Sequence, residues 1–113
     1  MAYFHKNLTQ EKWNNFSKDQ QILNIASELS RAKNWIKKQD KNYTQNSLDR
    51  AFELIDLTIN DNKWRNSSLK ELLRLREMLG EFYIGLNKNI NELIKLIKIL
   101  LKFNKLTAGV IVS

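Results

Sequence analysis

The sequence contains no cysteine, no proline and only three glycines, at Gly80, Gly85 and Gly109. A chain without cysteine forms neither disulfides nor thiolate metal sites, and we expect a reducing, cytoplasmic location. Proline and glycine are the residues that interrupt helices most strongly, so their scarcity favours long helices. The length of 113 residues is that of one domain. The sequence therefore predicts a single helical domain over 1–113.

Histidine is almost absent as well, since the chain has only His5, close to the N-terminus. A Ser-His or Cys-His arrangement needs a positioned imidazole, and neither a glycine-rich phosphate loop nor zinc-ligand spacing is present. Asp49, Glu53 and Asp56 share one helical stripe, but no ligand from a second element is identifiable, which favours a solvated acidic face over a cation site. We expect no catalytic residue, no metal and no cofactor, and a protein that is not an enzyme.

Long uncharged apolar runs are missing, because lysines interrupt the most hydrophobic segment every three or four residues. A membrane-spanning helix needs about 20 mostly apolar residues, and a signal peptide needs an apolar core that MAYFHKNLTQ lacks. We therefore expect no membrane partner. The formal net charge is +7, and residues 86–113 carry +4 of it through five lysines and one glutamate. A protein that binds nucleic acid with its whole body more often has a basic face across that body.

Apolar residues recur with a helical period along most of the chain. Two capping boxes, Ser17 with Gln20 and Ser68 with Glu71, predict helix starts, and Gly85 is expected to follow a helix in the left-handed conformation. Short connections favour antiparallel neighbours. The sequence predicts an all-α fold, an antiparallel bundle of four main helices plus a short N-terminal helix. The expected helices are 9–16, 18–38, 44–60, 69–84 and 90–106, between an arm at 1–8 and a frayed tail at 107–113.

The helix expected at 90–106 is the most hydrophobic, with apolar residues over roughly 240° of its circumference. A helix on a protein surface has an apolar stripe a little over 100° wide. The excess predicts a central bundle helix, an oligomer interface or a membrane-surface element. We expect this helix to contact a second copy or a protein partner. The residues expected at that interface are Leu96, Ile99, Leu100, Phe103 and Leu106.

Arg76 falls near the centre of the apolar face expected for 69–84. A buried guanidinium needs a carboxylate, helix-end carbonyls or an anionic ligand around it. We expect a buried ion pair with Glu28 or Asp56, and an interface role or an anion site remain as alternatives. Gly80, one turn further on, is expected to let another helix approach closely. The face itself is expected to consist of Leu69, Leu72, Leu73, Leu79 and Tyr83.

The loop after the helix expected at 44–60 contains Lys63, Trp64 and Arg65. A loop tryptophan between cations can stack on an unpaired base while the cations hold phosphates, which makes these residues a candidate nucleic-acid contact. The same tryptophan can instead fold back and close the end of the bundle, and this is the interpretation we favour. Trp13 and Trp35 lie off the central apolar stripes and are expected to cover the margin of the bundle.

Four segments of the sequence resemble a family of short bacterial all-helical proteins for which we know no assigned activity. They are IASELSRAKNW at 25–35, DRAFELIDLTI at 49–59, KWR at 63–65 and LKELLRLRE at 69–77. The resemblance covers roughly residues 9–85, and the last 28 residues, 86–113, lie outside it. It implies a helical fold and carries no activity, ligand or site residue with it.

These observations predict a non-enzymatic interaction protein that self-associates or docks a protein partner through its C-terminal helix. The alternative is a small basic module that binds RNA or single-stranded DNA, which the charge of +7 and the Lys63–Arg65 loop support. Such a module could serve as an accessory subunit of a nucleoprotein or toxin–antitoxin assembly, which one sequence does not distinguish from the other two readings.

Overall fold

The computed structural model of the chain describes residues 7–65, 68–86 and 88–103. Within these ranges the secondary structure is helical, without strands, so the all-α prediction is confirmed. Four longer helices follow a short N-terminal one, and a 3-10 turn precedes the third of them. The elements are α1 (Gln10–Asn14), α2 (Lys18–Lys37), α3 (Lys41–Ile59), η1 (Asn62–Trp64), α4 (Leu69–Ile84) and α5 (Ile90–Leu101).

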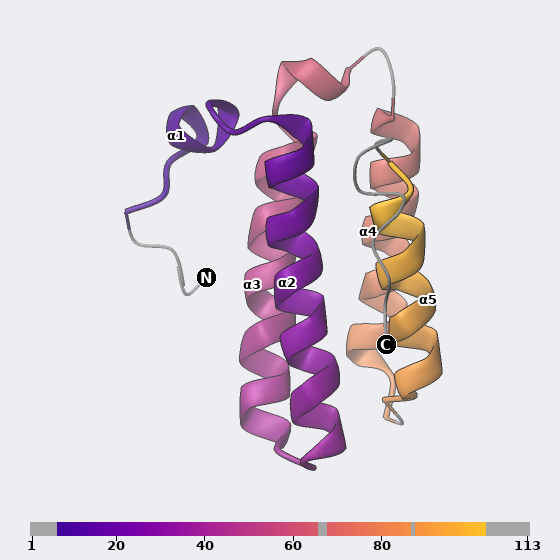
Figure 1. The fold of residues 1–113 in the computed structure, drawn as a ribbon. Coiled ribbons are helices and arrows are strands. Elements are labelled where there is room, and N and C mark those ends of the chain that lie inside the picture. The colour runs from indigo at the N-terminus through magenta and orange to yellow at the C-terminus, as the bar shows by residue number, and fades with distance from the viewer. Residues whose placement is uncertain (1–6, 66–67, 87, 104–113) are drawn as a thin grey trace.

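Helices α2 to α5 form a bundle in which successive helices run in opposite directions (Figure 1). Each of them contacts two neighbours, in the ring order α2, α3, α4, α5 and back to α2. The short α1 packs outside this ring against α3. One end of the bundle carries η1 and is called the η1 end below. The opposite end holds the α2–α3 turn and the α4–α5 loop and is called the turn end.

The helix starts follow from local side chains. Ser17 and Gln20 form the predicted capping box, since the Ser17 hydroxyl accepts from the Gln20 amide and the Gln20 side chain accepts from the Ser17 amide. Helix α3 begins at Lys41, three residues before the expected Thr44. The reason is Asp40, whose carboxylate accepts from the Tyr43 amide at 3.0 Å and so caps the helix early.

The boundaries of α4 differ from expectation in their capping. Ser68 makes no side-chain capping hydrogen bond, so the second capping box is wrong. Gly85 has φ −67° and ψ 141°, an extended conformation, and is not the left-handed residue expected there. The Lys88 ammonium performs that role instead, because its Nζ donates to the carbonyls of Tyr83 at 2.5 Å and Gly85 at 2.6 Å.

The core lies between the four long helices, and α4 enters it with a different face from the one expected. Its buried residues are Leu72, Leu75, Leu79 and Phe82, whereas Leu73 is 49% exposed. Because α4 packs against α5 as well as α3, its apolar face is turned toward α5. The many leucines of α4 would allow either of two faces to be buried, and the contact with α5 determines which one is.

The remaining predictions concern a membrane-spanning helix and the two ends of the chain, which the structure describes only in part. No helix among the described residues is long and apolar enough to cross a membrane. Helix α5 ends at Leu101, with Lys102 as its C-cap. Most of the arm expected at 1–8, the end of the last helix with Leu106, and the tail expected at 107–113 lie outside the described residues.

Replacing Gly80 by alanine is expected to stabilise the fold. A Cβ placed on Gly80 would meet no atom within 4 Å, so the expectation that this glycine permits a close helix approach is wrong. Alanine in a helix interior is favoured over glycine by about 0.5–1 kcal/mol. Urea unfolding of Gly80→Ala should show a gain of about that size at unchanged m-value, and a loss of stability would instead mean that the position is crowded.

Candidate functional site

Trp64, the centre of the candidate nucleic-acid loop, is completely buried at the η1 end of the bundle. Its indole N–H donates to the Gln21 side-chain oxygen at 2.7 Å. A ring enclosed in this way cannot stack on a base, so Trp64 as a nucleic-acid contact is wrong. The other interpretation of this residue, a tryptophan that closes the end of the bundle, agrees with its burial.

Gln21 is the residue that holds Trp64 in place. Its side chain is fully buried, and its Nε2 donates to the Trp13 carbonyl at 2.9 Å and to the Asp61 carboxylate at 2.8 Å. With the bond from Trp64, the amide uses both its donors and its acceptor. One side chain of α2 therefore links α1 to the segment between α3 and α4.

Lys63 completes this network. Its ammonium donates to the carbonyls of Asn14 and Phe16, each at 2.7 Å, and to the Asp61 carboxylate at 2.6 Å. Burial by itself raises the pKa of Asp61, but the hydrogen bonds from Lys63 and Gln21 outweigh it, and the pKa lies below its ordinary value. Asp61 is thus ionised near neutral pH, and Lys63 serves the fold rather than a phosphate.

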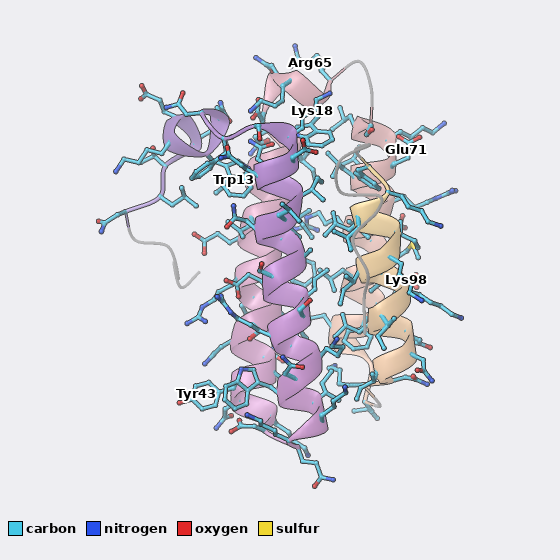
Figure 2. The ribbon with its side chains drawn as sticks, in the orientation of Figure 1. Trp13, Lys18, Tyr43, Arg65, Glu71 and Lys98 are labelled. Carbon is cyan, nitrogen blue, oxygen red and sulfur yellow. The ribbon has the colours of Figure 1, made fainter. Side chains whose placement is uncertain are left out.

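Arg65 is the only exposed residue of the predicted Lys63–Arg65 contact. In Figure 2 its label lies at the outer edge of the η1 end. The Lys18 ammonium covers the Trp64 ring at 4.9 Å from the centroid, on the same end of the bundle. One exposed arginine without an accessible ring does not make the stacking site that the sequence suggested.

Trp13 is part of the core and not of the margin, as its 1% exposure shows. Its indole N–H donates to the Thr58 hydroxyl at 3.0 Å, and that hydroxyl donates to the Leu54 carbonyl at 2.7 Å. The five-residue α1 is too short to be stable alone. Trp13 gives it the apolar anchor that it needs on α3.

Arg76 forms its ion pair with Asp56, one of the two carboxylates expected, and a hydrogen bond at 2.5 Å from Nε to Oδ1 joins them. This hydrogen bond raises the pKa of Arg76 above its ordinary value. The expected burial is wrong, because the two side chains are 46% and 39% exposed. The changed phase of α4 moves Arg76 to the edge beside α3, where its guanidinium lies 5.6 Å from the Phe52 ring. An exposed pair of this kind adds little stability.

The acidic stripe of α3 faces α4. Asp49 accepts a hydrogen bond from the Tyr83 hydroxyl at 2.7 Å, and this bond is the main reason why the pKa of Tyr83 is raised. Asp56 is engaged by Arg76. Over the residues that the structure describes, no cluster of acidic or histidine side chains is placed to hold a metal ion. These carboxylates join two helices of the bundle.

The expected interface on α5 divides into buried and exposed residues. Leu96 and Leu100 are 4% and 0% exposed within the chain's own bundle, so they are not a free docking surface. Phe103 packs partly buried near Trp64, and Leu106 lies outside the described residues. Ile99 is 37% exposed. Most of the wide apolar arc of α5 is buried within the chain, because this helix packs against both α2 and α4.

A groove follows the outer boundary between α4 and α5. Its cavity volume is about 280 Å³, and exposed Met78 lies at its edge. Buried Phe82 and Leu96 provide apolar surface at its base. The lining residues are Met78, Glu81, Phe82, Glu92, Lys95 and Leu96. It is the place where the C-terminal helix offers apolar surface next to accessible charge.

A larger hollow of about 730 Å³ opens at the turn end, between the α2–α3 turn and the α4–α5 loop. Lys41 and Lys88 bring ammonium groups to it, and burial lowers the pKa of Lys88. Asp40, the carboxylate in its lining, caps α3. The full lining is Ile36, Gln39, Asp40, Lys41, Thr44, Gln45, Gly85, Leu86, Lys88 and Asn89. Within this lining Lys88 caps the end of α4 and Asn89 caps the start of α5, so part of the polar surface serves the fold.

The turn end also holds an aromatic pair that sequence reasoning missed. Trp35 and Tyr43 stack across the α2–α3 turn with ring centroids 4.5 Å apart. The only signal in the sequence is two aromatic residues on either side of a lysine-rich turn. The reversal at Gln39, which has φ 59°, brings the two rings together, and a helical period does not predict such a contact.

Comparisons of this chain with models of known protein families, with curated proteins and with solved structures gave no match. Its function is therefore inferred from its own surfaces.

Replacing Gln21 by leucine should cost about 2–4 kcal/mol of unfolding free energy. The change leaves the buried Trp64 indole N–H without a partner, and an unsatisfied buried group costs about 1–3 kcal/mol. It also removes one hydrogen bond to the Asp61 carboxylate, which keeps its bond from Lys63. Asn34→Leu, at an exposed position of the same helix, is the matched control and should change stability by less than about 0.5 kcal/mol. Equal losses in the two variants, measured by urea unfolding, would show that Gln21 does not organise this end.

Proposed function

We propose that this chain is a non-enzymatic interaction protein that self-associates through the outer face of α4 and α5. The observation that carries the proposal is an apolar strip flanked by exposed side chains of both charges. We place this role in the cytoplasm, for which the absence of cysteine is the support.

The apolar part of this face consists of Met78 on α4 and Ile99 on α5, which are 36% and 37% exposed. Ile99 lies four residues after the groove residue Lys95, so the two share one side of α5. The groove gives this strip a concave base of Phe82 and Leu96. A second copy would cover side chains that are half-exposed in one chain.

Charge is distributed unevenly along the same face. Because α4 and α5 are antiparallel, the late residues of α4 and the early residues of α5 both lie at the turn end. Glu81 and Glu92 bring carboxylates to the face there, and Arg74 and Lys102 bring positive charge toward the η1 end. The charged residues on or beside the face are Glu81, Lys88, Glu92 and Lys95 near the turn end, and Glu71, Arg74, Lys98 and Lys102 toward the η1 end.

A two-fold axis through the middle of the face would place Glu81 and Glu92 of one copy over Arg74 and Lys102 of the other. Such an isologous contact uses one patch twice and needs self-complementary charge. Stable interfaces bury about 800 Å² on each partner, and a strip of two exposed apolar residues supplies only part of that area. We expect a reversible dimer whose population depends on protein concentration and falls with salt.

A second function, binding of single-stranded nucleic acid, no longer rests on Lys63 and Trp64. The observation that favours it is the aromatic pair at the turn end, where Tyr43 is 54% exposed. This candidate uses another surface and is independent of self-association.

Ile99→Lys is expected to convert the dimer to a monomer, because it places a charge in the middle of the apolar strip. Leu23→Lys is the matched control, since Leu23 is 43% exposed on α2, away from the α4–α5 face. Light scattering coupled to size-exclusion chromatography, over micromolar to millimolar protein, should show a concentration-dependent dimer for the wild type and for Leu23→Lys only. A wild type that remains monomeric throughout, or equal dissociation by both variants, would overturn the proposal.

A further inference from the structure

Tyr43 presents an open aromatic face at the turn end. Trp35 stacks against it with an interplanar angle of 21°, so one face of the Tyr43 ring is occupied. The side chain is nevertheless 54% exposed, which leaves its other face toward solvent. In Figure 2 Tyr43 points away from the bundle at the turn end. A planar group arriving from solvent can extend this stack without any rearrangement of the fold.

A lysine lies directly beside this aromatic pair. The Lys38 ammonium is 5.0 Å from the centroid of the Trp35 ring, and Lys37 and Lys41 are exposed near the same turn. Asp40 is the one acidic residue in the sequence between Arg31 and Leu48, and one oxygen of its carboxylate is occupied as the cap of α3. The turn beside the aromatic pair therefore carries an excess of positive charge.

We propose that the turn end binds single-stranded nucleic acid, with one base stacked on the open face of Tyr43. The ammonium of Lys38, beside the Trp35 ring, contacts a phosphate next to that base. Bases in a duplex are already stacked on each other, so an exposed ring selects an unpaired base. Every base has a π-face, and the binding is accordingly tolerant of sequence.

Anionic membranes are the competing ligand that the same end could attract. Ile84 and Leu86 are 78% and 100% exposed beside the lysines, and basic residues next to exposed aliphatic ones suit a lipid surface. The stacked aromatic pair favours nucleic acid, because a lipid headgroup does not require an aromatic ring. Vesicles of anionic phospholipid therefore belong in the test.

The test is fluorescence anisotropy of labelled oligouridine and oligothymidine with the full chain, at low salt and over a salt series. Tyr43→Ala should weaken binding about tenfold, since stacking on one aromatic residue contributes about 1–3 kcal/mol. Tyr43→Phe retains the ring and should bind within about twofold of the wild type. The double variant Lys37→Gln with Lys38→Gln should also weaken binding and reduce the salt dependence.

The matched control removes the same charge elsewhere. Lys12→Gln with Lys70→Gln, at exposed positions away from the turn end, should weaken binding less than the turn-end pair does. The inference is overturned if the wild type binds neither oligonucleotide at low salt. It is equally overturned if both lysine pairs matter alike and Tyr43→Ala has no effect, or if anionic vesicles bind and the oligonucleotides do not. Circular dichroism of each variant confirms that the helices are retained.

Discussion

The hydrogen-bond network around Gln21 is the interaction on which the η1 end of the bundle depends. A single buried amide accepts from Trp64 and donates to Asp61 and to the Trp13 carbonyl. Groups of this kind stabilise a fold only when every donor and acceptor is satisfied, because an unpaired one is costly inside a protein. Lys63 satisfies the remaining acceptors, so that α1, the start of α2 and η1 are fixed together.

This network shows that the Lys63–Arg65 motif, which the sequence suggested as a nucleic-acid contact, is mainly structural. A tryptophan between two cations has the composition of a nucleic-acid contact, yet Trp64 and Lys63 are engaged in closing the bundle. The surfaces left for partners are elsewhere, on the outer side of α4 and α5 and at the turn end. The role of a residue such as Lys63 depends on what lies opposite to it, and only the fold supplies that.

Periodicity and capping chemistry in the sequence predict most of the fold. Spacing of apolar residues identifies each helix, and the Ser17 capping box fixes one start to the residue. The spacing of apolar residues is less informative where two faces of a helix are equally apolar. The leucines of α4 allow either of two faces to be buried, and packing against α5 selects the one that leaves Leu73 and Arg76 exposed. The stack of Trp35 on Tyr43 depends on a chain reversal, which no helical period encodes.

Hydrogen exchange of the three tryptophan indole protons, followed by NMR, tests most directly whether the Lys63–Arg65 loop is structural. The indole N–H groups of Trp13 and Trp64 are buried and hydrogen-bonded to Thr58 and Gln21, whereas Trp35 is half-buried at the surface. We predict slow exchange for the first two, approaching the rate of global unfolding, and fast exchange for Trp35. A Trp64 indole proton that exchanges as fast as that of Trp35 would contradict the account and return this loop to the candidates for binding.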